Sequence, residues 1–165
     1  MYADVAANLA GTVLDKKCGR DIMYYRCLNS YRSRSVKMLA CPPLPYAPRV
    51  LIVEDEHIIA MATSVNLKRM GCEVVATAAT GEQAVDYAAR KKPDVVLMDI
   101  MLQGSMNGIE AARQIHDAAP GMHIIYCTAY TDPGTMAQAA KTNPRAFMGK
   151  PLNYTELKTH IDDLG

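Results

Sequence analysis

From residue 49 onward, short apolar runs alternate with longer stretches in which apolar residues recur every three or four positions. Short apolar runs between turn residues are typical of strands buried on both faces of a sheet, and the three-or-four spacing is typical of helices. The predicted strands cover residues 50–53, 73–78, 94–99, 123–128 and 146–149. The predicted helices cover about 56–70, 81–92, 107–119, 133–142 and 153–164.

Residues that commonly begin or end helices agree with these limits. Gly71 follows the first helix as a C-cap, and Pro133 stands where a later helix begins. Asn153 with Glu156 resembles a capping box at the start of the last helix. The alternation of apolar strands with helices predicts a doubly wound α/β fold, in which helices cover both faces of a parallel sheet.

Polar and charged residues stand at the ends of four predicted strands. These are the acidic run 54–56, Asp99, Thr128 and Lys150, at the first, third, fourth and fifth strands. Because ligands bind at the carboxyl ends of strands in such sheets, we expect these side chains to share one rim. Three adjacent carboxylates repel one another unless a positive charge lies among them or they are open to water.

Charge divides the chain into two parts. Residues 1–48 hold seven Lys or Arg against three Asp, whereas residues 49–165 hold 11 basic and 14 acidic side chains. We expect 1–48 to be a basic N-terminal extension that ends in a proline-rich linker, 41–48. Two other interpretations stay open: a weakly ordered tail, and upstream sequence included by a misjudged start codon, with Met23 or Met38 as the true first residue.

The cysteines and the hydropathy bear on the compartment. The five cysteines are an odd number without a CxxC pair, and no secretory signal pattern precedes them, so free thiols in a reducing cytoplasm are expected. No apolar run approaches the ~18 residues that a membrane span needs. We therefore expect a cytoplasmic protein without a membrane partner. The net charge of +1 gives no indication of nucleic-acid binding either.

The residues at the strand ends resemble those of the response-regulator receiver domain of two-component signalling, of the chemotaxis-regulator type. Order and spacing fit over residues 49–165, and the markers are Glu54-Asp55, Asp99, Thr128-Ala129 and Lys150-Pro151. The resemblance implies a flavodoxin-like doubly wound five-stranded parallel sheet in the order 2-1-3-4-5, with helices on both faces. A flavodoxin-like domain whose acids coincide by chance is the alternative.

The resemblance also implies a chemistry for the rim. Asp99 would take a phosphoryl group from the phosphohistidine of a sensor histidine kinase or a histidine phosphotransfer protein. The groups that would bind Mg²⁺ are the carboxylates of Glu54, Asp55 and Asp99 and the main-chain carbonyl of Met101. The groups that would hold the phosphoryl oxygens are Lys150, the Thr128 hydroxyl and the Ala129 N–H.

Two further features follow from the family pattern. The switch aromatic lies three residues before the lysine, which here is Phe147, and it is either a gating ring or an ordinary core aromatic. The loop after Asp99, IMLQGSMNG, lacks a proline that many receivers have and is one residue longer before Gly108. It resembles a receiver subgroup that reads D-I-x-L-x-G-x-x-x-G.

The family pattern also bears on how long the phosphoryl group persists. Hydrolysis needs a water opposite the bond to Asp99, and the side chains that flank this approach correspond to Met101 and Tyr130. Both are bulky, and neither acts as a base near neutral pH, because a tyrosine hydroxyl titrates near ~10. Slow self-dephosphorylation is therefore expected. The alternative is that Tyr130 points toward the partner surface and leaves the water path open.

The first predicted helix carries an apolar stripe formed by Ile58, Met61 and Val65. It turns away from the line expected to face the core, which consists of Ile59, Ala62, Asn66, Leu67 and Met70. In the family, this face docks the histidine-bearing helices of kinases or phosphotransferases, so we expect the stripe to dock a partner. The alternative is that the N-terminal segment folds back and covers it.

Three classes of function compete. The leading one is a stand-alone receiver that acts as a phosphoryl relay or a protein-binding switch and catalyses only its own phosphorylation and dephosphorylation. The alternative is a regulator whose basic extension binds nucleic acid; since the last predicted helix ends beside Gly165, no C-terminal DNA-binding module is expected. The third class is a Mg²⁺-dependent phosphatase that also forms an aspartyl phosphate. Such enzymes usually have a second Asp where this chain has Met101, so the sequence speaks against this class. The downstream protein is unknown, and self-association as a homodimer is left open.

Overall fold

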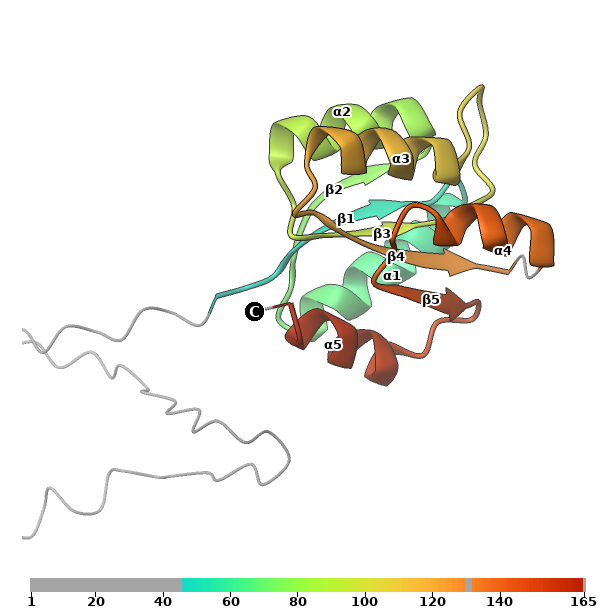
Figure 1. Ribbon diagram of the computed structural model, residues 1–165. Coiled ribbons are helices and arrows are strands. Elements are labelled where there is room, and N and C mark those ends of the chain that lie inside the picture. Colours follow the sequence, from blue (N-terminus) through green and yellow to red (C-terminus); the bar gives the residue numbers. More distant parts are fainter. Residues whose placement is uncertain (1–45, 130–131, 165) are drawn as a thin grey trace, which may run out of the picture. The chain divides into compact units, whose positions relative to one another are not determined.

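A computed structural model describes residues 46–129 and 132–164 (Figure 1). The predictions for residues 1–45 and for Tyr130 therefore lie outside the described residues. Strands and helices alternate throughout the described part, within a few residues of the predicted limits. They are β1 (Arg49–Val53), α1 (His57–Arg69), β2 (Glu73–Ala78), α2 (Gly81–Lys91), β3 (Val95–Met98), α3 (Gly108–Ala118), β4 (His123–Thr128), α4 (Pro133–Ala140), β5 (Ala146–Gly149) and α5 (Tyr154–Asp162).

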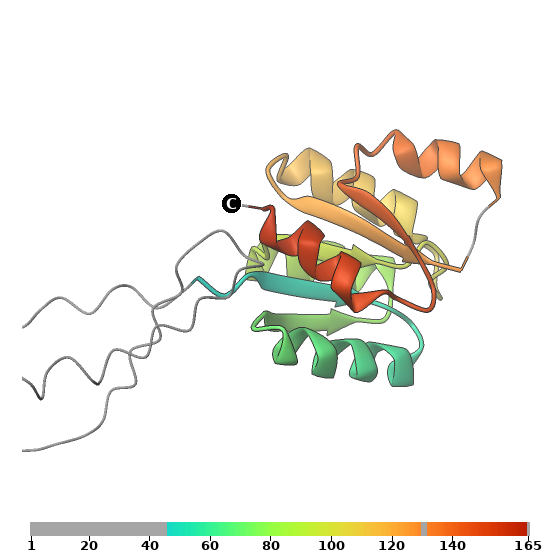
Figure 2. The same ribbon diagram turned by 90° about the horizontal axis from the view of Figure 1, so that it is seen from below.

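The strands form one parallel sheet in the order β2-β1-β3-β4-β5. Residues of α2, α3 and α4 join one buried cluster, and residues of α1 and α5 join the other. Figure 1 shows α2 and α3 above the sheet and α1 and α5 below it, and Figure 2, seen from below, shows α5 in front of the strands. The predicted doubly wound fold and its strand order are confirmed.

The central strands consist mostly of buried apolar residues because both of their faces are covered. In β1, Leu51 and Val53 belong to the α2–α4 side of the core, whereas Val50 and Ile52 belong to the α1–α5 side. Each such side chain, when fully buried, contributes about 1.5–3 kcal/mol of transfer free energy. The two described cysteines, at positions 72 and 127, are buried free thiols, as predicted for them.

The predicted core-facing line of α1 was right for Leu67 and Met70 and wrong for Ala62. The buried residues are Ala60, Thr63 and Leu67, whereas Ala62 is exposed. Small side chains let the helix approach the sheet, and only one large apolar residue marks the buried line. The apolar stripe of Ile58, Met61 and Val65 lies on the opposite side of the helix and is exposed by 84%, 65% and 44%.

The start of α3 lies close to the carboxyl end of the sheet. Asn107 begins α3 with a full capping box to Glu110, and Gly108 follows as its first residue. A Cβ at Gly108 would lie 1.9 Å from the carbonyl oxygen of Asp99, so only glycine permits this close approach. The start of α3 is thereby fixed against the end of β3.

No helix in the described part is long and apolar enough to cross a bilayer.

Candidate functional site

The carboxyl ends of the strands bring the predicted rim residues together. Backbone hydrogen bonds continue the sheet past its formal ends: Asp99 N–H donates to Val53 O over 3.0 Å, and Lys150 N–H donates to Thr128 O over 3.2 Å. Glu54 N–H likewise donates to Ala78 O over 2.9 Å. The backbones of these three rim residues are therefore held by neighbouring strands rather than by a free loop.

Three carboxylates form a cluster at this rim. One oxygen each from Glu54, Asp55 and Asp99 lies within 4.8 Å of the others. Glu54 and Asp99 are each only 6% exposed, and Asp55 is half-buried. Negative charge this concentrated and this dry requires a compensating cation.

Lys150 supplies one such cation. Its Nζ lies 2.6 Å from Glu54 Oε2 and 2.5 Å from Asp99 Oδ2, and its side chain is only 15% exposed. Burial lowers the pKa of Lys150, but the hydrogen bonds and charges of the two carboxylates outweigh this effect and hold the pKa above its ordinary value. Lys150 is therefore an ammonium at neutral pH that bridges the acids that follow β1 and β3.

The cluster keeps an unused ligand oxygen. Glu54 Oε1 is buried and accepts no hydrogen bond from any described residue. Burial raises the pKa of Glu54, and the charge and hydrogen bond of Lys150 offset this only in part. An orphaned, dry carboxylate oxygen beside two further carboxylates suits a hard divalent cation with oxygen ligands. The residues present therefore fit a Mg²⁺ ion.

The other predicted residues surround this cluster. Met101 N–H donates to Asp99 Oδ1 over 3.2 Å, while the Met101 side chain is 59% exposed. Thr128 is buried at the end of β4, and Ala129 follows it on the surface. The stripe on α1 begins at Ile58, three residues after Asp55, so it starts beside the rim.

Phe147 takes part in a contact that the sequence did not predict. Its ring stacks on Tyr126, with centroids 5.3 Å apart and an interplanar angle of 14°. The Tyr126 hydroxyl pairs with Thr142 Oγ1 at 3.0 Å, and Thr142 donates to Ala139 O in α4. A buried tyrosine needs a polar partner, which is the one signal that could have indicated this link. The stacking supports the interpretation of Phe147 as a core aromatic.

Comparisons with known proteins agree with this geometry. The family model of the response regulator receiver domain matches residues 50–162. The chain is 36% identical over 104 residues to the chemotaxis protein CheY of Thermotoga maritima, covering 63% of this chain and 86% of that protein. It is 35% identical over 116 residues to the transcriptional regulatory protein PdtaR of Mycobacterium tuberculosis, covering 69% of this chain but only 55% of that protein.

Solved structures give the same result. The signal receiver domain of a modulated diguanylate cyclase from Desulfovibrio desulfuricans has a TM-score of 0.68 and 34% identity, with 72% of this chain and 94% of that chain covered. A CheY-like receiver domain protein from Methanospirillum hungatei has a TM-score of 0.66 and 28% identity, with 72% of this chain and 97% of that chain covered. Fold, rim and family model coincide over one region, and the chain belongs to the response regulator receiver domain family.

Proposed function

We propose that this protein accepts a phosphoryl group on Asp99 from a phosphohistidine and signals by relaying the group or by binding a downstream protein. The observation that carries the proposal is Lys150, whose ammonium bridges Asp99 and Glu54 inside a buried carboxylate cluster. Such a site combines a nucleophile with fixed positive charge, which is what phosphoryl transfer requires. We also propose a cytoplasmic location, with a sensor histidine kinase or a histidine phosphotransfer protein as the donor.

The residues of the rim divide the work of the transfer. A carboxylate oxygen of Asp99 attacks phosphorus; the P–N bond of the phosphohistidine breaks, and its electron pair stays on the imidazole nitrogen. Lys150 turns from the Asp99 carboxylate toward a phosphoryl oxygen, and Thr128 with the Ala129 N–H holds another. Glu54, Asp55, Asp99 and the Met101 carbonyl would hold a Mg²⁺ ion, which would supply positive charge to the phosphoryl oxygens.

Partner docking is proposed for the stripe of Ile58, Met61 and Val65. These side chains are exposed although they are apolar, and the helix that carries them begins two residues after Asp55. Exposed apolar groups beside a reactive centre favour a protein partner that buries them during transfer. A histidine-bearing helix seated on this stripe would bring its phosphohistidine to Asp99.

The assignment of the nucleophile predicts that Asp99→Asn abolishes labelling. With acetyl phosphate and Mg²⁺, incorporation should fall by roughly a hundredfold or more, because the amide cannot attack phosphorus. Intact-protein mass spectrometry measures the adduct, with the exposed Asp117→Asn on α3 as the matched control. Undiminished labelling of the Asp99 variant would show that phosphorylation occurs elsewhere.

The proposed Mg²⁺ role predicts a pH-dependent effect of Glu54→Gln on stability. Burial raises the pKa of Glu54 in the folded protein above the ordinary value of 4.5. The contribution of Glu54 to folding stability is therefore fully present below pH 4.5, and it is lost as the pH rises through the raised pKa and the buried group becomes charged. Without metal, the Tm of the variant should therefore gain on that of the wild type as the pH rises. At pH 7, Mg²⁺ should raise the Tm of the wild type more than that of the variant.

Thermal unfolding followed by circular dichroism, from about pH 4 to 8, checks both parts of this prediction. Glu56→Gln, at the exposed neighbouring position, is the control and should follow the wild type. Parallel curves for Glu54→Gln and the wild type at all pH values, with equal shifts in Mg²⁺, would contradict it.

The docking proposal predicts that Met61→Glu slows phosphoryl transfer from a kinase but not from a small phosphodonor. Transfer from the cognate phosphorylated kinase should slow by about tenfold or more, because a buried charge costs at least about 1.4 kcal/mol at the interface. Labelling by acetyl phosphate should be unchanged, since the small donor needs no docking surface. Gln114→Glu adds the same charge on the exposed side of α3 and should affect neither rate. Equal slowing with both donors would indicate damage to the site instead.

The proposed shielding by Met101 and Tyr130 predicts faster loss of the phosphoryl group when either is made polar. Decay of phosphorylated protein in Mg²⁺ should accelerate by about tenfold in Met101→Asn and in Tyr130→Glu, a barrier change of about 1.4 kcal/mol. Decay followed by mass spectrometry after removal of the donor gives the rate. Unchanged or slower decay would mean that these side chains do not guard the approach of water.

A further inference from the structure

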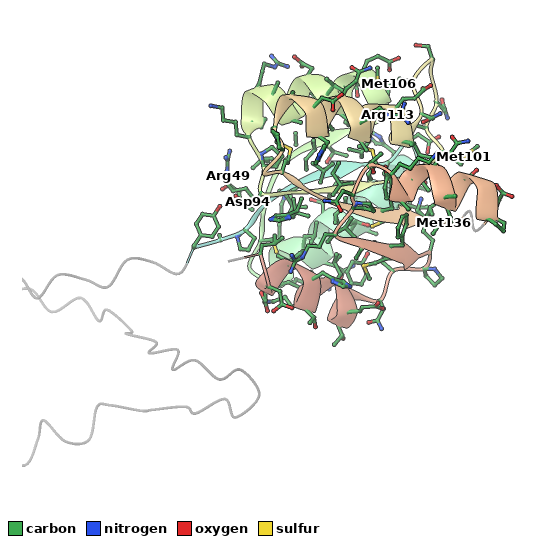
Figure 3. All side chains as sticks on the ribbon, in the orientation of Figure 1. Arg49, Asp94, Met101, Met106, Arg113 and Met136 are labelled. Carbon is green, nitrogen blue, oxygen red and sulfur yellow. The ribbon has the colours of Figure 1, made fainter. Side chains whose placement is uncertain are left out.

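The loop between β3 and α3, residues 100–107, is bonded to the first turn of α2. Ser105 Oγ donates a hydrogen bond to Glu82 Oε1 over 2.6 Å, between residues 23 positions apart. This bond lowers the pKa of Glu82, so the acceptor is a carboxylate at neutral pH. Figure 3 labels Met101 and Met106 near the two ends of the loop.

A second contact joins the same two segments. A Cβ at Gly81 would lie 2.7 Å from the carbonyl oxygen of Met106, so the backbone of the loop can approach α2 only over a glycine. Gly104 has a φ of +113°, which a residue with a side chain rarely adopts, and it faces Glu82. The attachment of the loop to α2 therefore involves both backbone fit and a side-chain hydrogen bond.

The two ends of the loop are joined to each other and to Asp99, which follows β3. Gly108 N–H donates to Ile100 O over 2.9 Å, and Met101 N–H donates to Asp99 Oδ1 over 3.2 Å. Met101 thus lies between the contact with Asp99 and the contact with α2. A backbone carbonyl in a loop held at both sides loses little conformational freedom when it binds a ligand.

We infer that Glu82 is a positioning residue for the metal site: through Ser105 it holds the loop that carries the Met101 carbonyl. This role rests on the proposed function, because Met101 acts as a ligand only if the cluster binds Mg²⁺. Glu82 itself belongs to α2 and is separate from the carboxylate cluster. Its effect on the ion therefore passes through the loop.

The Mg²⁺ dissociation constant of the full chain tests the inference, measured by titration calorimetry with Mg²⁺ alone. Ser105→Ala and Glu82→Ala should each weaken binding by about 3- to 10-fold, the range that one net hydrogen bond supports. Ser105→Thr and Glu82→Gln keep a donor and an acceptor and should stay close to the wild type. Asp86→Ala removes the same charge one turn further along α2 and should have no effect, which excludes long-range electrostatics.

Gly81→Ala gives an independent test, because alanine favours the helix while its methyl group displaces the loop. It should weaken Mg²⁺ binding.

Amide hydrogen exchange in metal-free protein provides a readout that does not depend on Mg²⁺. Peptides that cover 100–107 should exchange about tenfold faster in Ser105→Ala and Glu82→Ala than in the wild type or Asp86→Ala. Unchanged exchange and unchanged Mg²⁺ affinity in these variants would overturn the inference while leaving the proposed function intact. Failure of the wild type itself to bind Mg²⁺ would overturn the proposed function, and the role of Glu82 with it.

Discussion

The burial of an ammonium among carboxylates at the strand ends is the constraint on which the site depends. Lys150 follows β5 and Asp99 follows β3, so the lysine side chain has to reach across β4. Neighbouring strands lie ~4.8 Å apart, and only a long side chain spans two such intervals. The strand order and the position of β5 at the sheet edge are therefore what allow one cation to contact Asp99 and Glu54 together.

This arrangement trades stability for chemistry. Burial keeps the pKa of Glu54 above its ordinary value, and one of its oxygens accepts no hydrogen bond from the described residues. A core built for stability alone would place apolar side chains there, as it does at Val53 and Met98 just before the rim. The apolar strands below the rim offset the cost, and the charged rim keeps the groups that the proposed function requires.

The sequence predicts the elements and the rim well because both depend on local patterns. Continuous apolar runs mark strands covered on both faces, and parallel strands bring their ends to one edge, so Asp99 and Lys150 could be placed together from order alone. The buried face of α1 was predicted only in part, at Leu67, because Ala60 and Thr63 carry no strong apolar signal. The bond of Ser105 to Glu82 could not be predicted, since it joins a loop to a helix 23 positions away without a repeating pattern. For Tyr126, burial indicates that the hydroxyl needs a partner, but no pattern identifies Thr142 as that partner.

The apolar stripe and the loop of residues 100–107 lie on opposite faces of the sheet. The apolar stripe lies on α1, which packs on the same side as α5, whereas the loop of residues 100–107 is held by α2 on the opposite side. Sites that share no contacts change their free energies nearly additively. Under the proposed function, substitutions on α1 would alter the choice of phosphodonor, and substitutions in α2 or the loop would alter the position of the Met101 carbonyl. Asp99 lies between the two faces, where both effects would meet.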